Sequence, residues 1–367
     1  MGSPIKHWFA RLVSLMLLNV LACVPASAQS RAPIETVLAT LNRLSIELPT
    51  TFIVNEPVRT PLEALSREPC DQKAIEELGA ALEKIGRRRE AATAHISFSA
   101  TCPGHYAPSL RIAVNILLGL SDYARAASVA SDLIALEPYK DNGYYLRALA
   151  NDRGGLFKQA IDDYVTAIEL FGSKEQISSV AYLGMARDYE KLGRFCDAVL
   201  PIETWVSLNP ARNDTSQTRA IIADYTAKGH CQPAAASGEE VFKIARQNST
   251  VKLPVTINGV PGNLILDTGA TFVSLTATFA QKAKVQIDQE SSLRIHTANG
   301  ISDGKQGRAA TIQLRTLAAK DVPIVVQSDA KAAYGEGVDG LLGMSFLSQF
   351  NVSIGTQAVR ISSRKGK

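Results

Sequence analysis

A helical pattern that repeats about every 35 residues constrains the fold of this chain of 367 residues more than any other feature. In the stretch LGAALEKIGRRREAATA, apolar residues recur at helical spacing on both sides of Gly86, and Pro103 ends the unit. Pro138 follows after 35 residues, and Pro210 after a further 72, about twice that spacing. A single helix pair cannot cover its own apolar face, so such units stack into an extended array.

Three further units combine large apolar residues with small ones, and a proline ends two of them. One runs through Leu110, Ala126 and Pro138, the next through Tyr144, Ala148, Gly155, Ala160, Tyr164 and Ala167, and the last through Tyr182, Tyr189, Gly193, Ala198 and Pro210. Together the units resemble the tetratricopeptide repeat, a pair of helices with small residues where the helices touch. The resemblance covers roughly residues 72 to 210, and residues 218 to 231 predict a capping helix. It implies a groove that holds a peptide segment; a spacer or a dimerisation surface is the alternative.

Beyond residue 231 the pattern predicts a linker and then strands. The stretch QPAAASGEE is small, polar and contains proline, as linkers do. VKLPVTINGVPGNLILD alternates like a strand, turns at Asn258-Gly259 and returns as a second strand. LRIHTANGISDGKQGRAATIQLRTL and KDVPIVVQS continue with strands and glycine-containing turns. The C-terminal part is therefore expected to be mostly β.

An ionisable residue interrupts the second of these strands in LILDTGATFVSL. Asp267 supplies a carboxylate, Thr268 a hydroxyl that can lock a loop, and Gly269 a backbone that bends tightly. A carboxylate placed after a buried strand is costly unless it is used or hydrogen-bonded. On its own the triplet is compatible with an ordinary turn.

A second motif follows the Asp-Thr-Gly triplet. In VDGLLGMSFLSQFNVSI, two leucines and a glycine precede a predicted short amphipathic helix through Phe346, Leu347 and Phe350. This hydrophobic-hydrophobic-Gly segment consists of Leu341, Leu342 and Gly343. Together, the two motifs resemble those of retropepsin-like aspartic proteases over about residues 245 to 360.

The resemblance implies an all-β protease barrel and assigns a role to each matching residue. It implies that Asp267 is catalytic, that Thr268, Gly269 and Ala270 form the active-site loop, and that Thr297, Ala298, Asn299 and Gly300 form the tip of a flap. Aspartic proteases use two carboxylates, which share one proton. The chain contains one Asp-Thr-Gly and no Asp-Ser-Gly. The second carboxylate is therefore expected from a second copy of the chain, in a homodimer formed through the protease domain.

The N-terminus predicts export. MGSPIKHWFAR carries two basic residues, LVSLMLLNVLACV is a short apolar run, and PASAQ offers a small-residue cleavage site. By resemblance to bacterial proteins of this kind, the expected location is the bacterial periplasm. A retained N-terminal anchor or a lipoprotein ending its signal at Cys23 is the alternative. The predicted organisation is a signal peptide over residues 1–28, a helical segment over 29–70, the repeat domain over 71–231, a linker over 232–244 and the protease domain over 245–367.

Four cysteines remain after the predicted cleavage, an even number in a compartment where disulfides persist. Because each pair would lie within neighbouring helices, we expect Cys70 to pair with Cys102 and Cys196 with Cys231; buried free thiols are the alternative. No C-x-x-C spacing is present and the histidines are scattered, so no metal site and no cofactor are expected. The net charge of +4 is small and argues against a nucleic-acid partner.

These observations favour a multidomain aspartic endopeptidase, whose repeat array recruits or positions a protein or peptide substrate. The alternative is a dimeric scaffold or peptide-binding protein with a catalytically silent β domain. The intact Asp267-Thr268-Gly269 favours the enzyme, since a silent domain has no need of it.

Overall fold

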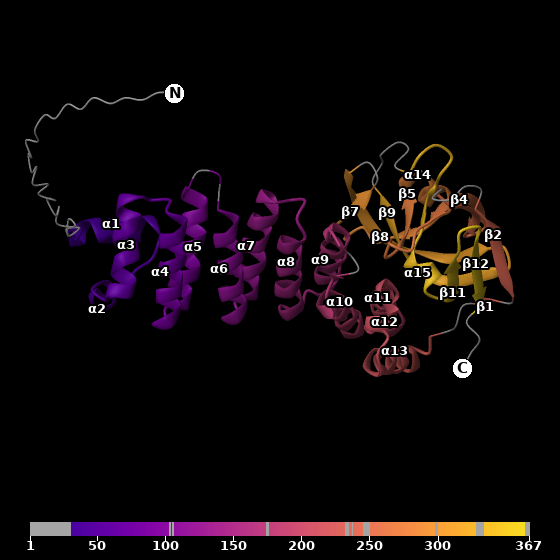
Figure 1. Ribbon diagram of the computed structural model, residues 1–367, viewed down its shortest axis with the longest axis horizontal. Helices are drawn as coiled ribbons and strands as arrows, with labels where there is room; N and C mark the ends of the chain where they lie inside the picture. The colour runs from indigo at the N-terminus through magenta and orange to yellow at the C-terminus, as the bar shows by residue number, and fades with distance from the viewer. Residues whose placement is uncertain are drawn as a thin grey trace, which may run out of the picture.

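The computed structural model describes residues 31–102, 104, 106–173, 176–231, 235–236, 238–244, 250–297, 300–327 and 334–363. A row of helices leads into a β domain (Figure 1). The predicted signal peptide, residues 1–28, and the proline at position 103 lie outside the described residues. None of the described helices is both long and apolar enough to cross a membrane.

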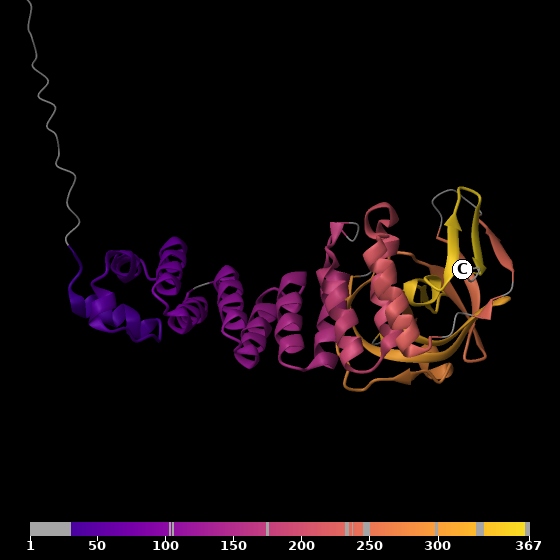
Figure 2. The ribbon, with the colours of Figure 1, turned by 90° about the horizontal axis from the view of Figure 1, so that it is seen from below.

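The helices form antiparallel pairs that stack side by side along the array (Figures 1 and 2). Three helices precede the pairs: α1 (Ile34–Arg43), α2 (Thr50–Ile53) and α3 (Glu56–Arg67). The four pairs are α4 (Gln72–Lys84) with α5 (Arg88–Thr101), α6 (Ala107–Gly119) with α7 (Tyr123–Leu136), α8 (Asp141–Arg153) with α9 (Phe157–Leu170), and α10 (Ser179–Lys191) with α11 (Phe195–Leu208). The array ends in α12 (Pro210–Asn213) and α13 (Ser216–Gly229), and the latter is the predicted capping helix.

The tight turn inside each helix pair needs one residue with a positive φ. Gly86, Gly155 and Gly193 fill this position in three pairs, with φ of 79°, 79° and 70°. Ser121 takes the same place in the second pair at φ 59°. A side chain is disfavoured in this region of backbone space, which explains why glycine recurs at the repeat period.

Two disulfides close the ends of the array. Cys70 bonds to Cys102 across the first helix pair, and Cys196, at the start of α11, bonds to Cys231, just after the capping helix. The Cα atoms of each pair lie 5.5 Å apart. Both predicted pairings are confirmed, and the alternative of buried free thiols is wrong. Disulfides closing loops of this length typically stabilise a fold by about 3 kcal/mol.

A buried carboxyl pair lies inside the array. Asp188 of α10 is 0% exposed, and no donor within the described residues reaches either of its oxygens. Burial, together with the carboxyl of Asp152 beside it, raises the pKa of Asp188 to about 8, against a smaller opposing effect of Arg187. Two carboxylates this close cannot both be charged, so the pair holds a proton at neutral pH.

The β domain is a closed barrel with a small second sheet. The barrel strands follow the order β9-β5-β10-β4-β3-β8, and pairing of β8 with β9 closes the ring. Its strands are β1 (Ala235–Ala236), β3 (Lys252–Ile257), β4 (Val260–Leu266), β5 (Val273–Thr276), β6 (Gln286–Ile287), β7 (Leu293–Thr297), β8 (Gly300–Leu314), β9 (Leu317–Gln327) and β10 (Gly340–Leu342), with helix α14 (Ala277–Lys282) after β5. The second sheet contains β2 (Glu239–Lys243), β11 (Phe350–Ile354) and β12 (Ala358–Ser363).

Strand β2 corrects the predicted linker over residues 232–244. Residues 239–243 pair with β12, with Val241 opposite Arg360. The two adjacent glutamates gave this stretch a polar pattern, but Glu240 is only 8% exposed and accepts hydrogen bonds from Thr316. Glu240 thus belongs to the β domain, because residues of the loop after β8 donate hydrogen bonds to its carboxylate.

Of the two elements predicted around the motifs, the hairpin is confirmed and the helix is shorter than predicted. Asn258 and Gly259 form the predicted turn between β3 and β4, with φ of 50° and 82°. The helix predicted through Phe350 is shorter: α15 covers only Met344–Leu347, and Phe350 begins strand β11. Phe346 and Phe350 nevertheless pack together, with ring centroids 4.8 Å apart. Their spacing of four residues therefore looked helical although only one turn forms.

Strand β10 runs between β4 and β5 and fixes the loop that joins them. Leu341 lies opposite Ile265 of the parallel strand β4 and opposite Ser274 of the antiparallel strand β5. A Cβ on Gly343 would overlap the carbonyl oxygen of Phe272. A glycine therefore ends the strand because the backbone of the β4–β5 loop leaves no room for a side chain.

We predict that Asp188→Asn makes the repeat array less sensitive to pH. The folded state binds the proton of Asp188 more tightly than the unfolded chain does, since the pKa is raised. This contribution is fully present below about pH 4 and is lost as pH rises through about 8. The variant should raise the free energy of unfolding by at least about 1–3 kcal/mol more at pH 8.5 than at pH 5.

Thermal unfolding followed by circular dichroism at both pH values measures this effect. Asp132→Asn, at an exposed position of α7, is the matched control and should leave the pH dependence as it is. An equal change at pH 5 and pH 8.5 in Asp188→Asn would contradict the prediction.

We predict that Gly343→Ala destabilises the β domain by about 3 kcal/mol, because its Cβ would meet backbone atoms that cannot move independently. Gly355→Ala is the control, since its Cβ would lie 3.4 Å from its nearest neighbour, the carbonyl oxygen of Ala358. Urea unfolding of both variants measures the difference. Similar midpoints for the two would show that the loop tolerates a side chain at residue 343.

Candidate active site

Asp267 begins the loop between β4 and β5, where β10 supports it from one side. Its backbone N–H donates to the carbonyl of Leu342 at 3.2 Å. Its Oδ1 accepts a hydrogen bond from the N–H of Gly269 at 2.8 Å. The carboxylate is thus held by its own loop and is half-buried, while Thr268 and Gly269 are exposed. The Asp-Thr-Gly triplet therefore presents a fixed carboxylate below an exposed loop tip.

The residues after β10 bind the other half of the loop. The N–H of Met344 donates to the carbonyl of Ala270 at 2.8 Å, and that of Ser345 donates to the carbonyl of Thr271 at 3.0 Å. The hydroxyl oxygen of Ser345 in turn accepts from the N–H of Val273 at 2.8 Å. The two sequence motifs, far apart in the chain, therefore form one hydrogen-bonded unit around Asp267.

A pocket of about 460 Å³ opens beside Asp267. The β domain and the repeat array both line it. From the array come Val165, Glu169, Leu170, Phe171, Gly172 and Leu208; from the β domain come Asp267, Gly269, Ala270, Thr271, Phe272, Ser274, Ile295, Val325, Gln327 and Leu341. A pocket of this size, lined by apolar side chains and several polar groups, has room for a ligand.

One face of helix α9 holds the β domain in this position. Asp162, Thr166 and Glu169 lie four and then three residues apart, which places them on one side of the helix. The hydroxyl oxygen of Thr166 accepts from the N–H of Arg294 in β7 at 3.0 Å. The hydroxyl of Thr271 donates to Glu169 Oε1 at 3.0 Å. The array thus contacts both β7 and the active-site loop.

Asp162 makes the most deeply buried of these contacts. Its Oδ1 accepts from the hydroxyl of Ser291 at 2.9 Å and from Gln306 Nε2 at 2.6 Å, and its Oδ2 accepts from the N–H of Ser292 at 2.9 Å. Burial raises the pKa of Asp162 to about 6, and these hydrogen bonds oppose the rise. The two serines directly precede β7, so this contact fixes where β7 begins.

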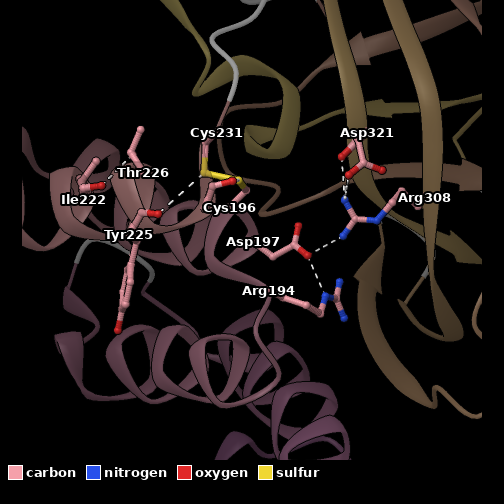
Figure 3. Close-up of a disulfide and its surroundings, with 10 residues drawn as sticks. Arg194, Cys196, Asp197, Ile222, Tyr225, Thr226, Cys231, Arg308 and Asp321 are labelled. Atoms are coloured by element: carbon pink, nitrogen blue, oxygen red, sulfur yellow. Dashed lines mark hydrogen bonds and ion pairs between the residues drawn. A yellow bond between two sulfur atoms is a disulfide. The ribbon is translucent and has the colours of Figure 1, made fainter.

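A second polar contact joins α11 to the barrel beside the Cys196 disulfide (Figure 3). Arg308 of β8 donates to Asp197 Oδ2 at 2.6 Å, and Arg194 donates to the same oxygen at 2.7 Å. Arg308 also donates to the carbonyl of Asp321 at 2.7 Å. The aspartate thus lies between two guanidinium groups, one from each domain.

The predicted flap corresponds to the hairpin of β7 and β8. Thr297 and Gly300 lie opposite each other at the ends of these strands. Ala298 and Asn299 lie outside the described residues, so the flap tip stays a prediction. Ile295 of the same hairpin lines the pocket beside Asp267.

Three polar residues in or beside the pocket were not found by sequence reasoning. Tyr334 hydrogen-bonds to Ser274 with an O–O distance of 2.5 Å, and burial raises its pKa. Gln327 and Glu169 line the pocket from β9 and α9. Tyr334 and Gln327 carry no motif, and Glu169 lies about 100 residues before Asp267 on a helix that the sequence assigns only to the repeats.

Comparison with known proteins agrees with this geometry. Residues 253–349 match the family described as "gag-polyprotein putative aspartyl protease". No curated protein matches the chain.

Three solved structures are similar to parts of the chain. A retropepsin-like aspartic protease from Rickettsia conorii is 25% identical, with a TM-score of 0.27, over 34% of this chain and 98% of its own. MamA from Desulfovibrio magneticus RS-1 is 18% identical, with a TM-score of 0.36, over 49% of this chain and 98% of its own. A thermophilic TPR protein from Thermus thermophilus is 16% identical, with a TM-score of 0.33, over 53% of this chain and 100% of its own.

The matched family covers both motifs, Asp267-Thr268-Gly269 and Leu341-Leu342-Gly343, which form one unit in the structure. The C-terminal domain therefore has a retropepsin-like fold and matches the aspartyl protease family over residues 253–349, and it follows an N-terminal array of tetratricopeptide-like helix pairs.

Proposed function

We propose that this protein is an aspartic endopeptidase that acts as a homodimer on protein or peptide substrates. The observation that carries the proposal is the position of Asp267, whose carboxylate is held by the N–H of Gly269 at the edge of a pocket of about 460 Å³. A fixed carboxylate beside a ligand-sized pocket is what activation of a water molecule requires.

The second carboxylate would come from Asp267 of a second copy. Two carboxylates about 3 Å apart share one proton, so one is charged and the other is not. The charged carboxylate takes a proton from a water molecule, which attacks the peptide carbonyl. The protonated one donates a hydrogen bond to the developing oxyanion. No covalent intermediate with the enzyme forms.

The exposure of the loop supports a shared site. Thr268 and Gly269 are exposed at the tip of the Asp267 loop, and the chain has a single Asp-Thr-Gly. A two-fold axis through this tip would bring the same loop of two copies together, as an isologous contact requires. The repeat array, which lies against the other side of the loop, leaves the tip open.

Export to the periplasm and recruitment of substrate by the array are part of the proposal. The two disulfides support a location in an oxidising compartment. Stacked helix pairs that lead to the pocket support a role in presenting an extended polypeptide.

We predict that Asp267→Asn lowers kcat/KM for peptide cleavage by a factor of at least about 10²–10⁴, because an amide cannot accept the proton of the water. The fold should persist, since the amide oxygen of Asn can still accept from the N–H of Gly269. Cleavage of a mixed peptide library, followed by mass spectrometry from acidic to neutral pH, measures the loss.

Asp339→Asn is the matched control. Asp339 is also half-buried, but its Oδ2 accepts a structural hydrogen bond from the N–H of Asn263 at 2.8 Å. The Asp339→Asn protein should keep its cleavage activity. Equal cleavage by wild type and Asp267→Asn would refute the protease proposal, and no cleavage by either protein would favour the scaffold alternative.

We predict that inactive Asp267→Asn chains reduce the activity of wild-type chains mixed with them. If subunits exchange freely, an equal mixture contains wild-type dimers as about a quarter of all dimers, so activity per wild-type chain falls to about half. Fluorogenic peptide hydrolysis at fixed wild-type concentration measures this, with sedimentation to follow the dimer. Activity that does not change with added Asp267→Asn, despite dimers of mixed composition, would place a complete site in one chain.

A further inference from the structure

The pocket beside Asp267 has a wall that the β domain does not supply. This array wall consists of the last residue of α9, the two residues after it and the last residue of α11, which are Leu170, Phe171, Gly172 and Leu208. The hydroxyl of Thr271 donates to Glu169 Oε1 beside the wall, and this bond holds the wall against the active-site loop. A ligand in the pocket therefore touches the repeat array and the loop of Asp267 at the same time.

The array wall supplies apolar surface that a ligand can reach. Its three apolar residues are half-buried, so part of each side chain is accessible. In the β domain, by contrast, the lining residues Phe272, Ile295 and Val325 are only 4%, 6% and 2% exposed. Ala270 and Leu341 are half-buried on that side. A ligand in the pocket therefore meets apolar side chains of both domains.

The inner side of the array wall is anchored in a core that both domains share. Phe171 and Leu208 pack against a cluster of buried residues that includes Tyr182 of α10, Phe272 of the active-site loop and Leu293 of β7. Close packing of such a core restricts side-chain movement, so the wall has a fixed position beside the pocket. A fixed wall favours binding, because little conformational freedom is lost when a ligand contacts it.

Gly172 shows that the array wall faces open space. A Cβ added to this residue would meet no heavy atom of the described residues within 4 Å, its two chain neighbours aside. Gly172 is also exposed and lines the pocket. The described part of the chain therefore leaves the space in front of the wall to a ligand.

The size and the wall of the pocket favour a large apolar side chain. A volume of about 460 Å³ has room for a side chain such as that of leucine or phenylalanine with the adjoining backbone. Binding against the wall removes apolar surface of both partners from water, which is favourable. Asp267 lines the same pocket, so a side chain bound there brings its own backbone close to the proposed catalytic carboxylate.

We propose that the array wall is part of a substrate subsite near the scissile bond that selects a large apolar side chain, with Phe171 and Leu208 as specificity-determining residues. The inference rests on the proposed function. It gives the repeat array a direct part in substrate selection, because the substrate side chain contacts α11 and the residues after α9 in addition to the β domain.

Binding is tested separately from cleavage, in the Asp267→Asn protein. The probes are fluorescently labelled nine-residue peptides that differ only at the central position, which is alanine, leucine, phenylalanine, lysine or glutamate. Fluorescence anisotropy should show the leucine and phenylalanine peptides binding at least about 10-fold more tightly than the alanine peptide, because the larger side chains bury more apolar surface.

Truncating the wall should remove this preference. Phe171→Ala or Leu208→Ala in the same protein should reduce it to within about 3-fold and change the affinity for the alanine peptide by less than about 2-fold. Phe195→Ala and Leu192→Ala are the matched controls. Both residues are half-buried and pack against the same core but do not line the pocket, so the controls should keep the preference.

A gain of specificity gives a second test that truncates nothing in the core. Gly172→Glu adds a carboxylate to the wall, and the fold should persist because the added Cβ has open space and the φ of Gly172 lies outside the left-handed region. The affinity of the lysine peptide relative to the glutamate peptide should rise at least about 5-fold. Leu156→Glu is the control, since it adds the same charge to the array at a residue that is 50% exposed and does not line the pocket.

The outcomes separate this inference from the proposed function. Equal binding of the alanine, leucine and phenylalanine peptides, or a preference that survives both alanine substitutions, overturns the inference even if the wild type cleaves peptides. If neither alanine variant folds, an unchanged lysine preference in Gly172→Glu overturns it. A preference that depends on Phe171 and Leu208, without cleavage by the wild type, supports the subsite and refutes the protease.

Discussion

The pocket beside Asp267 depends on the contact between helix α9 and the start of strand β7. Asp162 accepts three hydrogen bonds there, from Ser291, Ser292 and Gln306. A carboxylate this far from water is costly, and its pKa of about 6 reflects that cost. The three donors offset it and fix the geometry, since a carboxylate accepts only from donors that lie in place. One helix thereby sets the position of the β7–β8 hairpin, the active-site loop and the pocket wall.

A second contact makes this arrangement rigid. Asp197 of α11 lies between Arg194 and Arg308 of the barrel, and the Cys196–Cys231 disulfide lies at the neighbouring residue (Figure 3). The disulfide ties α11 to the end of α13, so the last repeat cannot separate from its cap. Two contacts on different helices restrain rotation about either one, which a single contact would permit. The array therefore acts as a fixed wall of the pocket.

The sequence predicted the features that depend on interactions between residues close together in the chain. The Asn258-Gly259 turn follows from the backbone preferences of two residues, and the helix pairs follow from apolar spacing and recurrent glycines. The Asp267 loop was found because its chemistry and Gly343 form recognisable motifs. Strand β2 was missed because its buried Glu240 is satisfied by Thr316, a residue 76 positions later. The polarity of the neighbouring residues does not indicate a hydrogen-bond partner so far away in the sequence.

The pocket wall was unpredictable for the same reason. Glu169 has the sequence context of an ordinary helix end, and its role depends on how the two domains dock. That docking gives the active-site loop two faces. Thr271 is buried against α9 and bonded to Glu169, whereas Thr268 and Gly269 remain exposed. Since Thr271 is only three positions after Thr268, a single short loop can meet a second copy at its tip and the repeat array at its base. A dimer formed at the tip would keep the array wall of each copy, so each side of the shared site would have its own pocket next to its own Asp267.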